Sequence, residues 1–325
     1  MFKKACLPAL LGAVVLSACS KKTHSEDTPL HLKIAYNVPE DREEDDYDVY
    51  VMNFDGSGAS NITRHPDVAW TYHAWKDQLF FISDRDTCAR CYFLYKSDAA
   101  GKNPRKVTGL RLEDSWMSSR KNGREMVVAG RIGREIRYQL YLVDVKTGDY
   151  RPLTRDTSAY YADPCFSPDG KQIVYRYRKS RRDRQEKAEL WIMNTDGSGT
   201  PRQLTFYPPA DTTAPWHAYH AGPPQWNAQA GYITYQSLQN GEYGIYAVTP
   251  DGKQTFKLAD FPLEAGWHDW SPDGNWLVMD LFDHEQKRFE IGLWNRKTKV
   301  FRQLTNTPRA EQSPVFVAEN RKNNH

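Results

Sequence analysis

Residues 192–205 read IMNTDGSGTPRQLT, and residues 51–63 read VMNFDGSGASNIT. Both segments have a strand-like apolar start, an Asp-Gly turn and a polar stretch that ends in an apolar residue followed by Thr. A single hairpin would explain either segment alone, but two near copies with matching flanks indicate an internal repeat. The same ending is then expected elsewhere in the chain.

The apolar-Thr ending recurs at a spacing typical of the blades of a β-propeller. The copies end at Thr63, Thr108, Thr154, Thr205 and Thr305, and a degenerate copy, Leu258-Ala259, fills the widest gap. Thr108 follows Thr63 by 45 residues, and Ala259 follows Thr205 by 54 residues. Between these marks, short segments rich in aromatic and β-branched residues alternate with turn sequences such as Ser-Pro-Asp-Gly. The sequence therefore contains six copies of the repeat, each about the size of one blade.

These repeats predict an all-β fold, a six-bladed β-propeller with four-stranded blades over residues 31–319. Segments such as Ile173-Val174-Tyr175 are apolar at adjacent positions, which is typical of strands covered on both faces. Residues 31–38 look like a second strand that lacks a first, and residues 313–317 look like a first strand that lacks a successor. We therefore expect the N- and C-terminal strands to pair in one blade, completed by residues 47–63, because this leaves no open seam.

The N-terminus predicts export and lipidation. Lys3 and Lys4 precede an apolar run that is too short to span a bilayer. Leu16-Ser17-Ala18-Cys19 then resembles the lipobox of bacterial lipoproteins, which implies a signal peptide at 1–18 and acylation, including palmitate, of Cys19. Ser20 rather than Asp follows, which implies a lipid anchor in the outer membrane with the protein facing the periplasm. The alternative is an ordinary cleaved signal with an incidental cysteine. We expect 19–30 to form a tether and 320–325 a polar tail.

The repeat also resembles a known family. FSPDGKQIVY (166–175) followed by LWIMNTDGSGTPRQLT (190–205) is similar to the propeller repeat of TolB, the periplasmic partner of the Tol–Pal system, and to the propellers of prolyl peptidases. The resemblance covers residues 31–319. TolB has an α/β domain before its propeller, whereas only a short tether is expected here. Prolyl peptidases have a hydrolase domain with a GxSxG nucleophile motif, which this sequence lacks.

Charge and cysteines limit the function classes. The net charge is only +3 and no basic stripe indicates a nucleic-acid partner. The acidic run 40–48 and the basic run 179–187 are interpreted as solvated loops. Cys88 and Cys91 are expected to form a disulfide across a hairpin, because a zinc site needs a second ligand pair and a redox motif needs a strand-to-helix context. Cys165 is expected to be a buried thiol.

Candidate binding residues lie in the connections from the fourth strand of one blade to the first strand of the next, which meet at one mouth of the channel. We expect these connections at 64–73, 109–117, 155–164, 206–224, 259–268 and 306–312, and most are rich in aromatic residues. The predicted ligand-binding residues are Trp70, Tyr72, His73, Trp116, Tyr161, Trp216, His217, His220, Trp267 and His268. Aromatic faces suit sugar rings or apolar side chains. The alternative is that the rings pack between blades and the histidines have only structural hydrogen bonds.

The sequence therefore favours a non-catalytic scaffold that binds an envelope protein or a glycan and contacts the membrane through its lipid anchor. We assign no catalytic residue and expect no cofactor. The alternative function is a metal-dependent polysaccharide lyase or hydrolase. Oligogalacturonate lyases are similar propellers with a three-histidine manganese site, so His73, His268 and either His220 or His217 are its candidate ligands.

Overall fold

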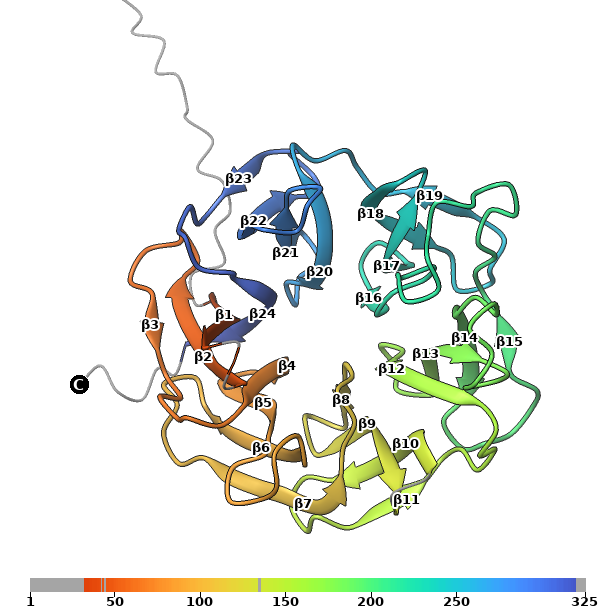
Figure 1. Ribbon diagram of the computed structural model, residues 1–325, viewed down its shortest axis with the longest axis horizontal. Coiled ribbons are helices and arrows are strands. Elements are labelled where there is room, and N and C mark those ends of the chain that lie inside the picture. Colours follow the sequence, from red (N-terminus) through yellow and green to blue (C-terminus); the bar gives the residue numbers. More distant parts are fainter. Residues whose placement is uncertain (1–31, 42, 44, 134–135, 320–325) are drawn as a thin grey trace, which may run out of the picture. The chain divides into compact units, whose positions relative to one another are not determined.

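The computed structural model describes residues 32–41, 43, 45–133 and 136–319. The predicted signal peptide, the lipidated Cys19, the tether and the tail 320–325 lie outside the described residues. Within the described part, the chain forms 24 strands and no helix, and the strands make six antiparallel sheets of four (Figure 1). No helix there could cross a bilayer. The predicted all-β, six-bladed propeller is confirmed.

The blades are numbered along the chain, and the strands of each are given from the innermost outward. Blade one consists of β24 (Gln312–Ala318), β1 (Leu32–Asp41), β2 (Asp46–Asn53) and β3 (Ser60–Asn61). Blade two consists of β4 (Ala69–Trp75), β5 (Gln78–Ser83), β6 (Phe93–Asp98) and β7 (Arg105–Arg111). Blade three consists of β8 (Ser118–Arg120), β9 (Glu125–Ile132), β10 (Ile136–Asp144) and β11 (Tyr150–Pro152).

The second half of the ring repeats the arrangement. Blade four consists of β12 (Tyr160–Phe166), β13 (Gln172–Arg178), β14 (Glu189–Asn194) and β15 (Arg202–Gln203). Blade five consists of β16 (Gln225–Asn227), β17 (Tyr232–Gln239), β18 (Glu242–Val248) and β19 (Thr255–Lys257). Blade six consists of β20 (Glu264–Trp270), β21 (Trp276–Phe282), β22 (Phe289–Asn295) and β23 (Phe301–Gln303).

The two ends of the propeller share blade one, as predicted. β24 pairs antiparallel with β1, with Ile34 opposite Phe316, and the two strands lie side by side in Figure 1. Blade six holds this joint from the side, because the Phe316 N–H donates to the Asp269 carboxylate at 2.9 Å and the Ser313 N–H donates to Asp280 at 3.1 Å. Burial raises the pKa of each of these two carboxyl groups to about 7.

The repeated threonine has a common structural role in four blades. Its hydroxyl accepts a hydrogen bond from the backbone N–H of a third-strand residue that lies beyond the end of the pairing with the fourth strand. The same hydroxyl donates a hydrogen bond to the side chain of the residue that precedes it in the third strand. The accepted bonds are Val49 to Thr63 at 2.9 Å, Leu140 to Thr154 at 2.9 Å, Leu190 to Thr205 at 2.8 Å and Ile291 to Thr305 at 2.8 Å. The side chains that accept from these hydroxyls are Asp48, Gln139, Glu189 and Glu290.

Apolar side chains fill the space between neighbouring blades. Between blades one and six, for example, Ile34 and Met52 pack with Val278, Ile291 and Leu293, and all five are at most 1% exposed. Because each sheet is covered on both faces, its strands are apolar at adjacent positions. The blade interfaces are therefore the core of the molecule.

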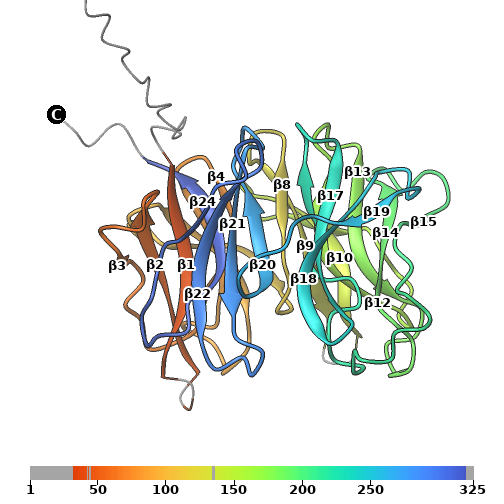
Figure 2. The same cartoon turned by 90° about the horizontal axis from the view of Figure 1, so that it is seen from above.

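The antiparallel order gives the ring two different faces, seen edge-on in Figure 2. We call the face with the connections between blades, and with the connections between second and third strands, the loop face. The opposite face, with the tight turns, is called the turn face. Leu32 at the start of β1 pairs with Ala318 at the end of β24, so the propeller begins and ends at the turn face.

Three inner strands, β4, β12 and β20, begin earlier than the sequence indicated, whereas β8 and β16 begin directly after their expected connections. Trp70, Tyr72 and His73 lie on β4 rather than in a connection, and Trp267 and His268 lie on β20. Inner strands face the channel and carry polar and aromatic side chains, so they lack the apolar pattern by which the other strands were found.

Candidate functional site: an aromatic mouth on the loop face

The loop face opens into a cavity of about 550 Å³, which we call the aromatic mouth. Blades one, two, four and six line it through residues such as Gln312, Trp70, Asp163 and Trp267, and the connections into blades three and five supply Trp116 and Tyr219. A cavity of this size, with aromatic walls and a few convergent polar groups, is typical of ligand sites in proteins.

Four aromatic rings form a continuous wall of the mouth. The ring centroids of Tyr72 and Trp116 are 4.5 Å apart, and those of Trp116 and Trp267 are 5.0 Å apart. Trp70 completes the circuit, at 6.2 Å from Trp267 and 6.3 Å from Tyr72. All four were predicted site residues, and the structure brings them together on blades two, three and six.

A buried ion pair lies beside this wall. Arg176 Nε on β13 is 2.8 Å from Asp163 Oδ2 on β12, and the two side chains are 15% and 2% exposed. Asp163 also accepts hydrogen bonds from the Ser115 hydroxyl and the Trp116 N–H of blade three, so it links two blades. The guanidinium of Arg176 stacks over the Tyr219 ring at 4.7 Å. These contacts hold the charge of Arg176 in place on one side of the cavity.

A second carboxylate, Asp114, borders the cavity with a different environment. Its side chain is exposed in the cavity, between the buried residues Glu113 and Ser115, and it accepts a hydrogen bond from the Tyr72 hydroxyl. Burial raises the pKa of Asp114, while the bond from Tyr72 lowers it. The adjacent Glu113, by contrast, is enclosed by Arg131 at 2.6 Å and Arg137 at 2.7 Å.

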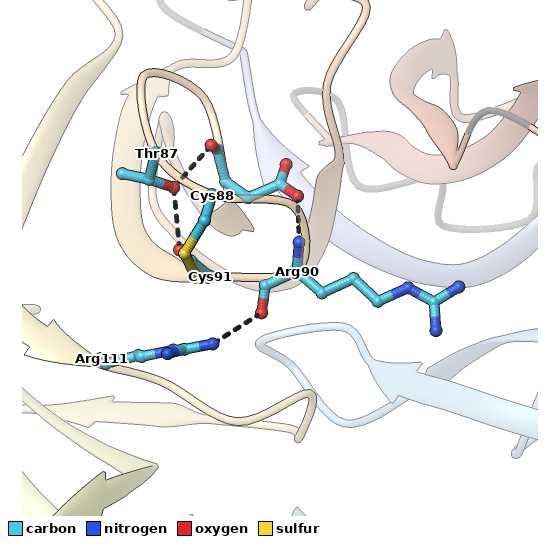
Figure 3. Close-up of a disulfide and its surroundings, with 6 residues drawn as sticks. Thr87, Cys88, Arg90, Cys91 and Arg111 are labelled. Atoms are coloured by element: carbon cyan, nitrogen blue, oxygen red, sulfur yellow. Dashed lines mark hydrogen bonds between the residues drawn. A yellow bond between two sulfur atoms is a disulfide. The ribbon is translucent and has the colours of Figure 1, made fainter. Parts of the chain in front are cut away.

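The rim of the mouth includes the disulfide loop of blade two. The structure joins Cys88 to Cys91 in the connection between β5 and β6 (Figure 3). The Asp84 carboxylate accepts the Arg90 N–H at 2.6 Å, and the Arg90 side chain makes a two-point ion pair with Asp45 of blade one, at 2.7 and 2.8 Å. The crosslinked loop thus supports a charged contact between two blades at the edge of the cavity.

The turn face holds a second cavity of about 850 Å³, lined in part by Trp75, Trp226 and Trp270. Tyr72 borders both cavities, whereas His73 borders only this one. His73 Nε2 lies 2.9 Å from Ser119 Oγ of blade three, and burial lowers the pKa of His73 to about 4. His73 is therefore separated from the aromatic mouth.

The other predicted histidines have separate environments. His268 is 3% exposed, with Nδ1 3.0 Å from Gly266 O and Nε2 2.8 Å from Thr234 Oγ1 of blade five, and burial lowers its pKa to about 4. His220 is 5% exposed with its ring 4.9 Å from that of Tyr207, and burial lowers its pKa to about 4 as well. His217 lies beside Trp216.

The remaining predicted residues, Tyr161 and Trp216, lie outside the mouth lining. Tyr161 packs against Tyr175 and Tyr177 of its own blade, in the apolar cluster between blades three and four. Trp216 is 48% exposed on the long connection into blade five, where Arg184 of the basic run stacks over it at 4.5 Å. These two residues therefore belong to a blade interface and to the outer surface.

The candidate metal ligands do not converge. His73 lies at the turn-face cavity, His268 lies inside the channel wall, and His220 packs on Tyr207. Among the described residues, no group of three His, Cys, Asp or Glu side chains is placed to hold a metal ion. The residues present do not fit a three-histidine centre.

Several residues of the mouth were not selected from the sequence. Arg176 lies on a second strand, and Asp45 and Arg90 lie in connections between second and third strands. These connections meet at the loop face by the same strand order that places the connections between blades there. An arginine inside the apolar segment QIVYRYR was a further signal, because a charge in a covered strand needs a partner.

Comparisons with known proteins agree with this fold. No protein-family model matches the chain. The crystal structure of TolB from Acinetobacter baumannii superposes with a TM-score of 0.66 over 89% of this chain and 67% of that one, at 16% identity. The fold is that of the TolB propeller. A putative TolB from Agrobacterium tumefaciens gives a TM-score of 0.60, and oligogalacturonate lyase in complex with manganese gives 0.54 over 79% of this chain, at 15% identity.

Two curated relatives match shorter parts of the chain. The Tol-Pal system protein TolB of Nitratidesulfovibrio vulgaris is 29% identical over 77 residues, which cover 24% of this chain and 17% of that protein. Dipeptidyl-peptidase 5 of Porphyromonas endodontalis is 32% identical over 114 residues, which cover 35% of this chain and 15% of that protein. These matches span only a small part of either relative.

Proposed function

We propose that this protein is a non-catalytic binding scaffold that captures a cell-envelope partner, a protein or a glycan, in the aromatic mouth. The observation that carries the proposal is the cavity of about 550 Å³, which is lined by four blades and by the connections into the other two. Its walls offer aromatic faces for apolar or sugar surfaces, and its charged groups fix the orientation of what binds. Loops on a rigid ring are also where binding sites commonly occur.

The cellular setting belongs to the same proposal. The lipobox-like segment ending at Cys19 supports a lipid anchor in the outer membrane, with the propeller in the periplasm. The likeness to a Tol-Pal system protein supports a role in the envelope. Substituting Cys19→Ala should release the protein from the membrane fraction, and retention of that variant in the membrane would count against the anchor.

Photo-crosslinking in living cells tests the mouth directly. A p-benzoylphenylalanine in place of Glu285, beside the lining residue Gln286, reports on the loop face. The matched control carries the same group in place of Lys171, an exposed residue next to a turn on the other face. We expect a discrete adduct only from position 285. An adduct only from position 171, or none from either, would contradict the proposal.

A further inference from the structure

The charges of the aromatic mouth are unevenly paired. Asp163 is paired with Arg176, and Asp45 with Arg90. Within the described part of the chain, Asp114 has no ion pair, and its one hydrogen bond, from Tyr72, goes to Oδ1. Its second oxygen, Oδ2, therefore has no partner among the described residues, and the side chain is exposed in the cavity.

This arrangement differs from that of the neighbouring carboxylates. Glu113, the preceding residue, is 1% exposed and is held by two arginines. A carboxylate as buried as Glu113 is normally stabilised by a cation in this way, because burial disfavours its charge. Asp114, by contrast, is exposed in the cavity and has no such cation beside it. Arg90 lowers the pKa of Asp114 only through space, while its Nε and Nη2 donate to Asp45. Asp114 is thus the cavity carboxylate that retains an open position for a cation.

The walls around this position suit the same kind of group. The ring of Tyr72, which donates to Asp114, packs at a tilt against that of Trp116. Trp116 contacts Trp267, and Trp267 contacts Trp70. The faces of indole and phenol rings attract cations, most strongly where water is excluded. An anionic ligand suits the cavity less, because the two arginines of its lining, Arg90 and Arg176, are each already paired with an aspartate, whereas Asp114 has no cation.

Resting on the proposed function above, we propose that the aromatic mouth binds the primary ammonium of a lysine side chain from a partner peptide, with Asp114 as its counter-ion and the Trp116 and Trp70 rings as its walls. The methylene stem of lysine would lie along the indole faces while its ammonium donates to Asp114 Oδ2. The lysine thereby supplies the cation that Asp114 lacks in the free protein.

The test uses the full chain and three small probes, with binding followed by saturation-transfer NMR. The probes are Nα-acetyl-lysine N-methylamide, its Nε-acetylated form and the norleucine analogue, which share a stem and differ in the charged group. We expect the lysine probe to bind at least tenfold more tightly than either neutral probe. Equal affinities of the three probes would overturn the proposal without needing any variant.

Two variants then test whether the Asp114 carboxylate is the charge that binds the lysine probe. Asp114→Asn should weaken binding of the lysine probe about tenfold and leave the norleucine probe unchanged. Glu285→Gln removes the same charge from the same face outside the cavity, and it should change binding of the lysine probe less than twofold. Equal losses of affinity for the lysine probe in the two variants would mean that the negative charge of the whole loop face attracts the probe. That result would overturn the role of Asp114 as the counter-ion.

The outcome also separates this proposal from the broader one. If a partner crosslinks at position 285 but the lysine probe shows no preference, the scaffold function stands and the lysine site is wrong. If binding of the lysine probe depends on Asp114 but no partner crosslinks at position 285, the lysine site stands and the scaffold function is wrong. Competitive binding of chitotriose in place of the lysine probe would indicate a glycan site and overturn the peptide assignment.

Discussion

Arg176 and Asp163 show how one pair of residues fixes the wall of the mouth. Replacing Arg176 by methionine should lower the free energy of unfolding by about 3–5 kcal/mol, because Asp163 would be left as a buried charge without a partner. Chemical denaturation measures this change.

The double variant Asp163→Asn, Arg176→Met is the control for that experiment. The asparagine keeps an oxygen for the Ser115 and Trp116 donors and tolerates the left-handed backbone at this position, where φ is +53°. The double variant should therefore be more stable than Arg176→Met alone. A double variant that is no more stable would show that the loss comes from packing of the long side chain.

The buried His268 should make stability depend on pH. Its pKa is about 4 in the folded protein and about 6.5 in an unfolded chain, so the unfolded state binds more protons between these values. His268 thus lowers stability as pH falls from about 6.5 to about 4. The stability advantage of the wild type over His268→Gln should shrink by up to about 3 kcal/mol over this window, as measured by urea unfolding.

His284 provides the contrast. It is exposed, and Glu264 raises its pKa, so its contribution to stability is present at low pH and is lost as pH rises. The advantage of the wild type over His284→Gln should grow as pH falls. Identical pH trends for the two variants would contradict the assignment of His268 as a neutral side chain.

At the level of single turns, two glycines with the same backbone conformation should differ in importance. Gly101 has φ of +74° and Gly197 has φ of +80°, and both lie in turns between third and fourth strands. A Cβ at Gly101 would lie 2.0 Å from Ile62 O of the adjacent blade, whereas a Cβ at Gly197 would meet no atom of the described residues within 4 Å, apart from its chain neighbours.

Alanine substitution separates backbone strain from packing between blades. Gly197→Ala should cost about 1 kcal/mol, because only the left-handed backbone is penalised. Gly101→Ala should cost about 2–4 kcal/mol, because blades one and two must also move apart. Thermal and chemical unfolding of the two variants measure the difference, and equal losses would mean that the turn of blade two adjusts freely.

Individual elements also show what sequence could reveal. The threonine ending could be recognised in the sequence because its hydroxyl accepts the same backbone hydrogen bond in blades one, three, four and six. Blade five, with Ala259, has no hydroxyl to do so, but its backbone still pairs, with the Leu258 N–H donating to Ile245 O. Three inner strands, β4, β12 and β20, begin before the positions predicted for them, because their first side chains face a channel rather than a core.

For the molecule as a whole, closure of the ring should be needed for folding. A chain that ends at Arg309 lacks β24 and leaves β1 without its inner partner. It also leaves Asp269 and Asp280 without the N–H donors of Phe316 and Ser313. We expect this chain to lose the cooperative unfolding transition, as followed by circular dichroism.

A chain that ends at Glu319 is the control for closure, and it should unfold like the full chain. Cooperative unfolding of the shorter chain at wild-type temperature would show that five blades and a partial sixth suffice.

At this scale the fold could be predicted more fully than the site. Repeat spacing and the two incomplete ends fixed the number of blades, because both depend on local sequence. The mouth depends on residues far apart in the chain, such as Asp114 with Tyr72 and Asp45 with Arg90. Nothing local distinguishes Trp116 in the mouth from Tyr161 between blades, since the difference comes from the direction in which each ring points.

Because Leu32 and Ala318 meet at the turn face, a fusion or surface linkage made directly at either residue would attach on the side away from the aromatic mouth. Immobilising the propeller by its termini should thus leave that cavity open to molecules in solution. Biosensor measurements on such a layer would sample the exposed loop side, whereas random coupling through lysines would orient the rings both ways.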